Sequence, residues 1–123
     1  MTMSPILFEN ARVFDGVHAE CREGMQVLVE SGVIREVSER EIQTSGAVID
    51  VSGRTLMPGL IDAHVHAYAS HVNVQRMEAA GEAYRTAHAA RMLSHALDCG
   101  FTTVRDIGGG DYGCREFIRN ELC

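Results

Sequence analysis

The first half of the chain alternates short runs of apolar, β-forming residues with two-residue turn signals. The runs cover residues 6–14, 25–30, 33–37 and 47–51, and Asp15-Gly16 and Ser31-Gly32 lie between the first three. Valine, isoleucine and phenylalanine at such positions favour strands, while Asp-Gly and Ser-Gly pairs favour tight turns. Residues 39–46 form a polar connection. The pattern predicts a small β-region over residues 1–57, either an antiparallel sheet or half of a β-sandwich.

The pattern changes after the Pro58-Gly59 break. Residues 60–66 form an apolar strand, and residues 73–99 place apolar side chains at steps of three and four, which is the spacing of a helix with one apolar face. Gly100 ends this helix, residues 101–106 are rich in β-formers, and a short helix is predicted over residues 114–121. Because strand, helix, strand, helix is the order of a parallel sheet, the predicted fold class is α/β.

Composition excludes several classes of protein. With 46% apolar and 23% charged residues, the 123-residue chain lies in the range of globular domains. Its apolar runs are too short for a membrane helix, and its first residues lack the basic and apolar segments of a secretory signal. We therefore expect a cytoplasmic protein that does not contact a membrane.

Charge and cysteine content narrow the chemistry further. The net charge of −6 and the lack of basic runs argue against a nucleic-acid partner. All 11 basic residues are arginines, so no lysine here can act as nucleophile, base or metal bridge. The four cysteines form no CxxC pair and are expected to be reduced and structural; they are Cys21, Cys99, Cys114 and Cys123.

The strand over residues 60–66 ends in two histidines one residue apart, His64 and His66. Since successive side chains of a strand point to opposite faces, the two imidazoles are expected on one face, about 6.5 to 7 Å apart along the chain. Such a pair can share a metal ion, and a catalytic zinc usually has three protein ligands and one position for water. Asp62 lies on the same face, where it either orients a ligand by a hydrogen bond or pairs with an arginine. The alternative for the histidines is burial against backbone carbonyls.

Other histidines and one tyrosine have weaker functional interpretations. His71 could reach a substrate from a loop, and Tyr68 could line the mouth of a pocket, but solvated loop histidines and packed aromatics are commoner. His88 and His95 are seven residues apart, about 10.5 Å along a helix, which favours packing or surface positions over a shared metal.

The end of the second predicted strand carries an aspartate and three glycines. Asp106 faces the same rim as the two histidines, where it either binds substrate or, as we favour, holds the glycine loop. Gly108-Gly109-Gly110 could cradle a phosphate, but it lacks the spacing and the lysine of a phosphate-binding loop. We therefore predict a flexible turn.

The run from Gly53 to His66, Gly-Arg-Thr-Leu-Met-Pro-Gly-Leu-Ile-Asp-Ala-His-Val-His, closely resembles the entry to the barrel in the amidohydrolase superfamily. The preceding β-region resembles the N-terminal half of the composite sandwich of these enzymes. The segment over residues 102–106, Thr-Thr-Val-Arg-Asp, with its glycines resembles their second barrel strand. This segment looks most like the prolidase and imidazolonepropionase-like branch, which includes Xaa-Pro and Lys/Arg dipeptidases.

The resemblance implies a metal-dependent (β/α)₈ TIM barrel that begins at residue 58, with one or two Zn²⁺ ions. The implied ligands are the HxH pair, a carboxylated lysine or glutamate, two further histidines and an aspartate, of which only His64 and His66 match this sequence. Since a complete barrel takes roughly 250 residues, we expect an N-terminal piece whose catalytic residues, including a general-base aspartate, lie beyond Cys123. The implied partners are a small-molecule or dipeptide substrate and the rest of the barrel, with a homo-oligomer left open.

The implied function is zinc-dependent hydrolysis of an amide or peptide carbon–nitrogen bond by a prolidase-like dipeptidase. Two alternatives stay open. One is a cyclic-amide hydrolase or deaminase of the same superfamily. The other, for the 123 residues themselves, is a non-catalytic fragment or accessory module, which we expect to be unstable alone because its parallel strands leave an open edge.

Overall fold

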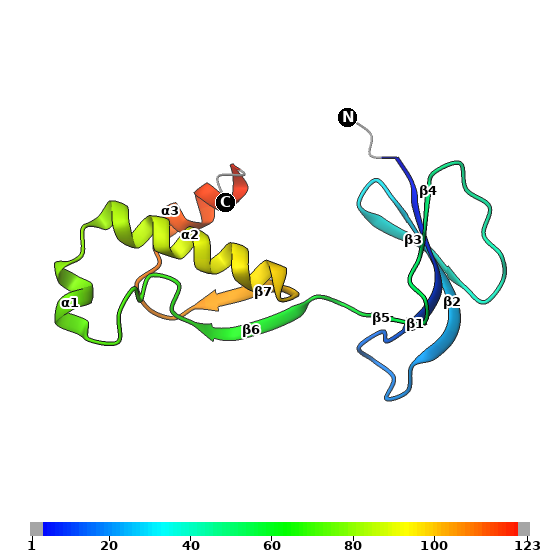
Figure 1. Cartoon of the computed structure of the whole chain (residues 1–123), viewed down its shortest axis with the longest axis horizontal. Helices are drawn as coiled ribbons and strands as arrows, with labels where there is room; N and C mark the ends of the chain where they lie inside the picture. Colours follow the sequence, from blue (N-terminus) through cyan, green and yellow to red (C-terminus); the bar gives the residue numbers. More distant parts are fainter. Residues whose placement is uncertain (1–3, 121–123) are drawn as a thin grey trace. The chain divides into compact units, whose positions relative to one another are not determined.

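The computed structural model describes residues 4–120, which divide into two compact units between Pro58 and Gly59 (Figure 1). The first unit is built of strands, and the second combines strands with helices. The fold class is therefore mixed α/β. None of the helices in the described part of the chain is long and apolar enough to cross a membrane.

The first unit is a sheet in the order β3-β2-β1-β4, with the short β5 also paired to β1. Its strands are β1 (Ile6–Val13), β2 (Arg22–Glu30), β3 (Val33–Ser38), β4 (Ala47–Asp50) and β5 (Thr55–Leu56). The first three strands pair antiparallel as the turn signals predict, but β4 and β5 pair with β1 in parallel. The expectation of a wholly antiparallel sheet is wrong, because the polar connection brings β4 alongside the start of β1 instead of back against β3.

Both faces of this sheet carry buried residues. Ala11, Val13, Met25 and Val27 form one cluster, and Leu7, Leu28 and Ile42 form another. Since Val27 and Leu28 are neighbours on β2, the two clusters lie on opposite faces of the sheet.

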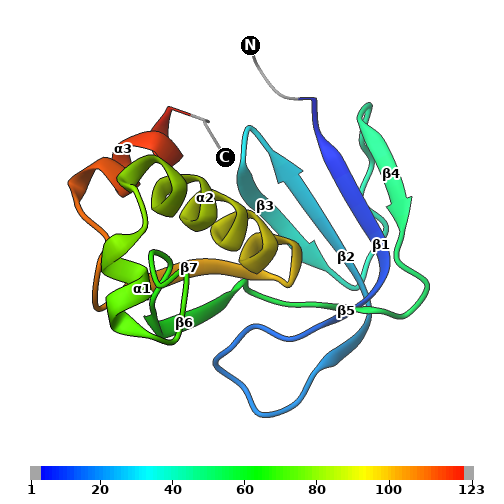
Figure 2. The ribbon, with the colours of Figure 1, turned by 60° about the vertical axis from the view of Figure 1, so that its left-hand side comes forward.

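The second unit contains β6 (Leu60–Val65), α1 (Val74–Ala79), α2 (Glu82–Asp98), β7 (Phe101–Asp106) and α3 (Tyr112–Arg119). The two strands form a parallel pair, as predicted, and α2 connects them and lies alongside β7 (Figure 2). A parallel pair requires such a crossover, because the chain has to return to the starting end of the first strand.

The predicted single helix over residues 73–99 is two helices. Ala80 and Gly81 are extended, with ψ of 132° and 146°, so α1 ends before them and α2 begins after them. Asn73 caps α1 by accepting a hydrogen bond from the Arg76 N–H at 3.0 Å. Gly100, with φ of +90°, follows α2 as predicted.

The last helix begins two residues earlier than predicted. Asp111 caps α3 and its carboxylate accepts a hydrogen bond from the Cys114 N–H at 3.3 Å, so the helix begins at Tyr112. Acidic caps of this kind satisfy the amides that a helix leaves free at its start. Glu121, the last residue of the predicted helix, lies outside the described residues.

A small core fixes the loop that follows β6. Ala67, Tyr68 and Ala89 are buried together, and Leu93 and Cys114 pack against them. Burial also raises the pKa of the Tyr68 phenol. Tyr68 is therefore a packing residue that joins this loop to α2, in agreement with the commoner of its two interpretations.

Candidate metal centre at the ends of two parallel strands

The carboxyl ends of β6 and β7 lie side by side. Val65 of β6 is in register with Asp106 of β7, and the Ile107 N–H donates a 3.1 Å hydrogen bond to the Val65 carbonyl. His64 and His66 flank Val65 in the sequence. The two histidines and the end of β7 therefore lie at the same end of the parallel pair, where both strands have their carboxyl ends.

A β-bulge lies within β6 directly before this end. Asp62 is in register with Val104 and Val65 with Asp106, so β6 contains three steps where β7 contains two. The extra residue interrupts the regular alternation of side chains and increases the local twist. Strict alternation, on which the predicted placement of Asp62, His64 and His66 rested, therefore does not hold through this stretch.

The structure nevertheless brings the two imidazoles together. The ring centroids of His64 and His66 lie 5.4 Å apart, and the ring planes are inclined by 75°. Both residues are exposed within the described part of the chain.

This separation fits two ligands of one ion. An imidazole nitrogen binds Zn²⁺ at about 2.0 to 2.1 Å, which puts the ring centres of two tetrahedrally arranged ligands about 5 Å apart. The edge-on arrangement at 5.4 Å is close to that distance. Within residues 4–120, no group of three or more histidine, cysteine, aspartate or glutamate side chains forms a metal site. The pair thus offers two nitrogen donors whose spacing suits a single ion.

Asp62 acts on the backbone of the bulge. Its Oδ1 accepts a hydrogen bond from the His64 N–H at 3.0 Å, and the residue is half-buried. The carboxylate therefore holds the peptide that carries the His64 ring. A hydrogen bond to one of the two histidines is one of the two roles that the sequence suggests for Asp62, although the contact is to the backbone and not to the ring.

The loop after β7 closes over the second histidine. The Gly108 carbonyl oxygen lies 3.5 Å from His66 Nδ1, while the Gly108 N–H donates to Asp106 Oδ1 at 2.8 Å. The other oxygen of Asp106 accepts a bond from the Ala67 N–H at 3.1 Å. Asp106 thus holds the glycine loop, which is the role we favour from the sequence. Its link to the loop after His66 is not visible in the sequence; the local signal is an aspartate two residues before a glycine.

The remaining histidines lie elsewhere in the second unit. His71 Nδ1 accepts a hydrogen bond from the Asn73 N–H at 2.9 Å, which ties it to the start of α1. His88 and His95 line a shallow depression on α2 with Arg91 and Met92. His95 Nε2 lies 3.7 Å from Cys99 Sγ. These contacts agree with surface positions.

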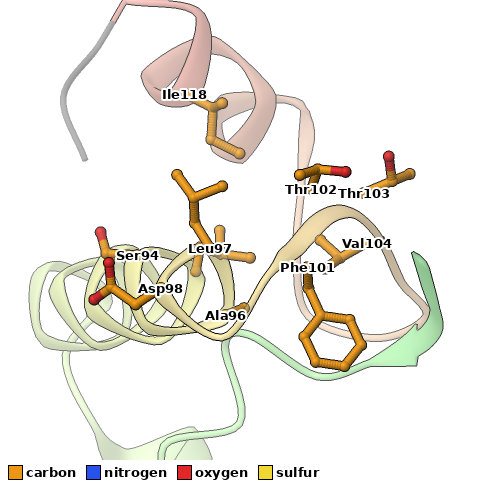
Figure 3. Close-up of a pocket in the computed structure, with 10 residues that line it drawn as sticks. Ser94, Ala96, Leu97, Asp98, Phe101, Thr102, Thr103, Val104 and Ile118 are labelled. Atoms are coloured by element: carbon orange, nitrogen blue, oxygen red, sulfur yellow. The ribbon is translucent and has the colours of Figure 1, made fainter. Parts of the chain in front are cut away.

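A second depression lies between α2, β7 and α3 (Figure 3). Leu97, Phe101 and Ile118 line it, together with the threonines at the start of β7. Asp98 is the charged residue among those that line it. This depression offers apolar contact and lacks the histidines of the strand ends, so it does not match metal chemistry.

The chain matches a family model and solved structures. A model of the amidohydrolase family matches residues 47–112. A solved amidohydrolase structure has 41% sequence identity and a TM-score of 0.89, over 97% of this chain and 29% of that chain. The structure of a prolidase complexed with N-methylphosphonate-L-proline has 31% identity and a TM-score of 0.89, again over 97% of this chain and 29% of that chain.

A curated relative matches a shorter stretch. The dihydroorotase of Carboxydothermus hydrogenoformans is 48% identical over 42 residues, which are 34% of this chain and 10% of that protein. The chain therefore spans about a tenth of the length of this relative and less than a third of the length of the two solved chains.

Proposed function

Because this chain belongs to the amidohydrolase family, we propose that it is the N-terminal part of a metal-dependent hydrolase that cleaves carbon–nitrogen bonds. In this proposal residues 1–57 are the N-terminal half of a composite β-sandwich, and residues 58–123 are the first two strand–helix units of a (β/α)₈ barrel. The parallel pair β6 and β7, joined through α2, supports the barrel, because such barrels repeat this unit. The likeness to a solved amidohydrolase over 97% of this chain supports both parts.

The observation that carries the proposal is the pair of imidazole rings 5.4 Å apart at the carboxyl end of β6. Barrels of this class place their active sites at the carboxyl ends of their strands. His64 and His66 would hold a divalent metal ion, for which we propose Zn²⁺. Asp62 would steady the first of these ligands through its backbone amide. The other ligands and the general base would come from later parts of the complete polypeptide.

The chemistry needs both a nucleophile and a polarised carbonyl. When bound, zinc lowers the pKa of a coordinated water to about 7 and acts as a Lewis acid toward the scissile carbonyl. The described residues bind and orient: His64 and His66 each offer one neutral nitrogen lone pair, and the bulge and the β7 loop hold their backbones. We assign none of the described residues as general acid or base.

The proposed substrate is a dipeptide, cleaved in a prolidase-like reaction on Xaa-Pro or Lys/Arg substrates. The 31% identity with a solved prolidase, over 97% of this chain, supports this choice. A second candidate is the hydrolysis of a cyclic amide, which the 48% identity with a dihydroorotase over 42 residues favours.

The test uses the complete polypeptide that contains this chain, loaded with Zn²⁺ and assayed with Xaa-Pro, Xaa-Lys and Xaa-Arg dipeptides and with dihydroorotate. We expect dipeptide hydrolysis that is lost, together with bound zinc, when both His64 and His66 are replaced by alanine. The control is His18→Ala, a surface histidine of the first unit that contacts Asp15, and it should keep activity and metal content.

The outcomes separate the parts of the proposal. Turnover of dihydroorotate without any dipeptide turnover would replace the first substrate class by the second. Zinc content and activity that are unchanged in the double variant would reject the metal centre. Zinc binding by the complete polypeptide without turnover of any of these compounds would reject both substrate classes and leave the metal centre in place.

A further inference from the structure

Resting on the proposed metal centre, we propose that Asp106 is a positioning residue for the ligand His66. Its carboxylate fixes the loop after β7, and the carbonyl of that loop holds the His66 ring in the orientation and tautomer that a metal ion requires. Asp106 itself would not touch the metal. This role goes beyond holding the glycine loop, because it predicts that changing Asp106 alters the orientation and tautomer of the His66 ring.

The carboxylate of Asp106 joins the two sides of the His66 ring. One oxygen accepts the N–H of Ala67, the residue directly after His66, at 3.1 Å. The other accepts the N–H of Gly108, whose carbonyl faces the ring, at 2.8 Å. Both oxygens are thus engaged, by two segments that are 41 positions apart in the sequence. The half-buried position of Asp106 favours these bonds over exchange with water.

The contact between His66 and Gly108 favours one tautomer of the imidazole. A carbonyl oxygen only accepts hydrogen bonds, so the 3.5 Å contact with His66 Nδ1, at the long limit of hydrogen-bond distance, favours the tautomer with the proton on Nδ1. The Nε2 lone pair is then free for a metal. Histidines that bind metals commonly donate their other ring N–H to a carboxylate or a backbone carbonyl, which fixes both tautomer and orientation.

The three glycines are explained by the same arrangement. A Cβ added at Gly108 would lie 3.3 Å from His66 Nδ1 and 3.4 Å from Cε1, and one added at Gly110 would lie 2.9 Å from Asp106 Oδ2. Gly109 has φ of +101°, which other residues rarely adopt. At Gly108 and Gly110 the loop therefore lies close enough to the ring and the carboxylate that a side chain would crowd them.

This arrangement leaves little support for a phosphate-binding role of the loop. The start of α3, which follows the glycines, is capped by the carboxylate of Asp111. A second anion next to that carboxylate would be repelled by it.

The test measures zinc affinity of the complete polypeptide, by competition with a chromophoric chelator, for the wild type, Asp106→Asn and Gly108→Ala. Asparagine keeps one acceptor oxygen and turns an amide N–H₂ toward a backbone N–H, so one of the two bonds is lost. Alanine at position 108 keeps both carboxylate bonds but crowds the ring. We expect zinc affinity to fall about 10- to 100-fold in each variant, the usual effect of losing such a supporting contact.

A second readout reports on the ring itself. In the metal-free protein, ¹H–¹⁵N correlation of labelled histidine should show His66 protonated at Nδ1 in the wild type and a mixture of tautomers in Asp106→Asn. The matched control is Asp50→Asn, which removes a carboxylate that also accepts the N–H two residues later, that of Ser52, at 2.7 Å. A second control is Gly81→Ala, where an added Cβ meets no atom within 4 Å. Both controls should match the wild type.

Failure of this inference and failure of the proposed function look different. Wild-type zinc affinity and an unchanged His66 tautomer in both Asp106→Asn and Gly108→Ala would overturn the positioning role and leave the metal centre in place. Loss of affinity in Gly108→Ala alone, with Asp106→Asn unchanged, would also overturn it. If replacing His64 and His66 by alanine does not change zinc binding, the metal centre fails and this inference fails with it.

Discussion

Replacing Gly59 by alanine should push β6 away from β7. A Cβ added at Gly59 would overlap Thr102 Oγ1 and Cγ2 and would lie 2.6 Å from Thr102 Cβ. Rotation of the threonine side chain moves its Oγ1 and Cγ2 but leaves its Cβ in place. Since carbon atoms in contact are about 3.5 to 4.0 Å apart, the two backbones must separate locally by about 1 Å.

The cost of this separation follows from two contributions. Overpacking of a closely fitted position costs about 1 to 3 kcal/mol. The Leu60 N–H, next to Gly59, donates a 2.8 Å hydrogen bond to the Gly100 carbonyl, and such a bond contributes about 0.5 to 1.5 kcal/mol. We expect Gly59→Ala to lower the free energy of unfolding by about 2 to 4 kcal/mol.

The assay is urea unfolding of the complete polypeptide, followed by circular dichroism, in a double-mutant cycle with Thr102→Gly. Glycine at position 102 removes all three clashing atoms, so it should recover about 1 to 3 kcal/mol of the loss. Gly81→Ala, which meets no neighbouring atom, serves as the glycine control. The explanation by close approach is refuted if Gly59→Ala is as stable as the wild type, or if its cost is the same with glycine at position 102.

Three further changes test other parts of the fold. Met25 is 1% exposed in the core of the first unit, so Met25→Ala should cost about 2 to 5 kcal/mol in urea unfolding; an unchanged midpoint would contradict this packing. Asp111→Ala removes the acceptor of the Cys114 N–H and should cost about 1 kcal/mol, seen as faster amide exchange in the first turn of α3, whereas unchanged protection would disprove the cap. The hydrogen bond from the Asn10 side chain is the largest cause that lowers the pKa of Asp50. The stability that ionised Asp50 contributes is therefore present above the ordinary aspartate pKa and is lost as the pH falls through the lowered pKa. Asn10→Gly should raise this pKa in a carboxyl ¹³C titration, and an unmoved midpoint would exclude the bond.

Local patterns predict the elements whose neighbours in space are also neighbours in the sequence. The Ser31-Gly32 pair adopts φ of 51° and 76°, and it joins β2 to β3 as a tight hairpin turn should. The strand, helix and strand of the second unit follow from periodicity, and their parallel pairing follows from their order.

Pairings set by distant residues are not visible in this way. The polar segment between β3 and β4 is long enough for β4 either to pair with β3 or to pair with β1. Only packing decides between these two arrangements. The break between α1 and α2 is similar. A single glycine inside a helix costs about 0.5 to 1 kcal/mol, so Gly81 alone does not reveal that the chain becomes extended there.

The same distinction between local patterns and distant contacts applies to the candidate site. The HxH spacing predicts that the rings of His64 and His66 lie together, and they do. The backbone geometry differs from the predicted one, since a β-bulge, defined by the pairing of β6 with β7, interrupts the simple alternation of side chains. The contact of His66 with Gly108 joins residues 42 positions apart and has no local pattern. An aspartate before glycines is common in turns, so the sequence predicts that Asp106 binds the glycine loop but not that this loop contacts the His66 ring.

The most direct measurement of the central claim is anomalous diffraction at the zinc absorption edge from crystals of the complete polypeptide soaked in a zinc salt. The account predicts a peak within about 2.1 Å of one nitrogen from each of His64 and His66, and that nitrogen is Nε2 for His66. Rings turned away from each other, with the peak bound to neither, would contradict it.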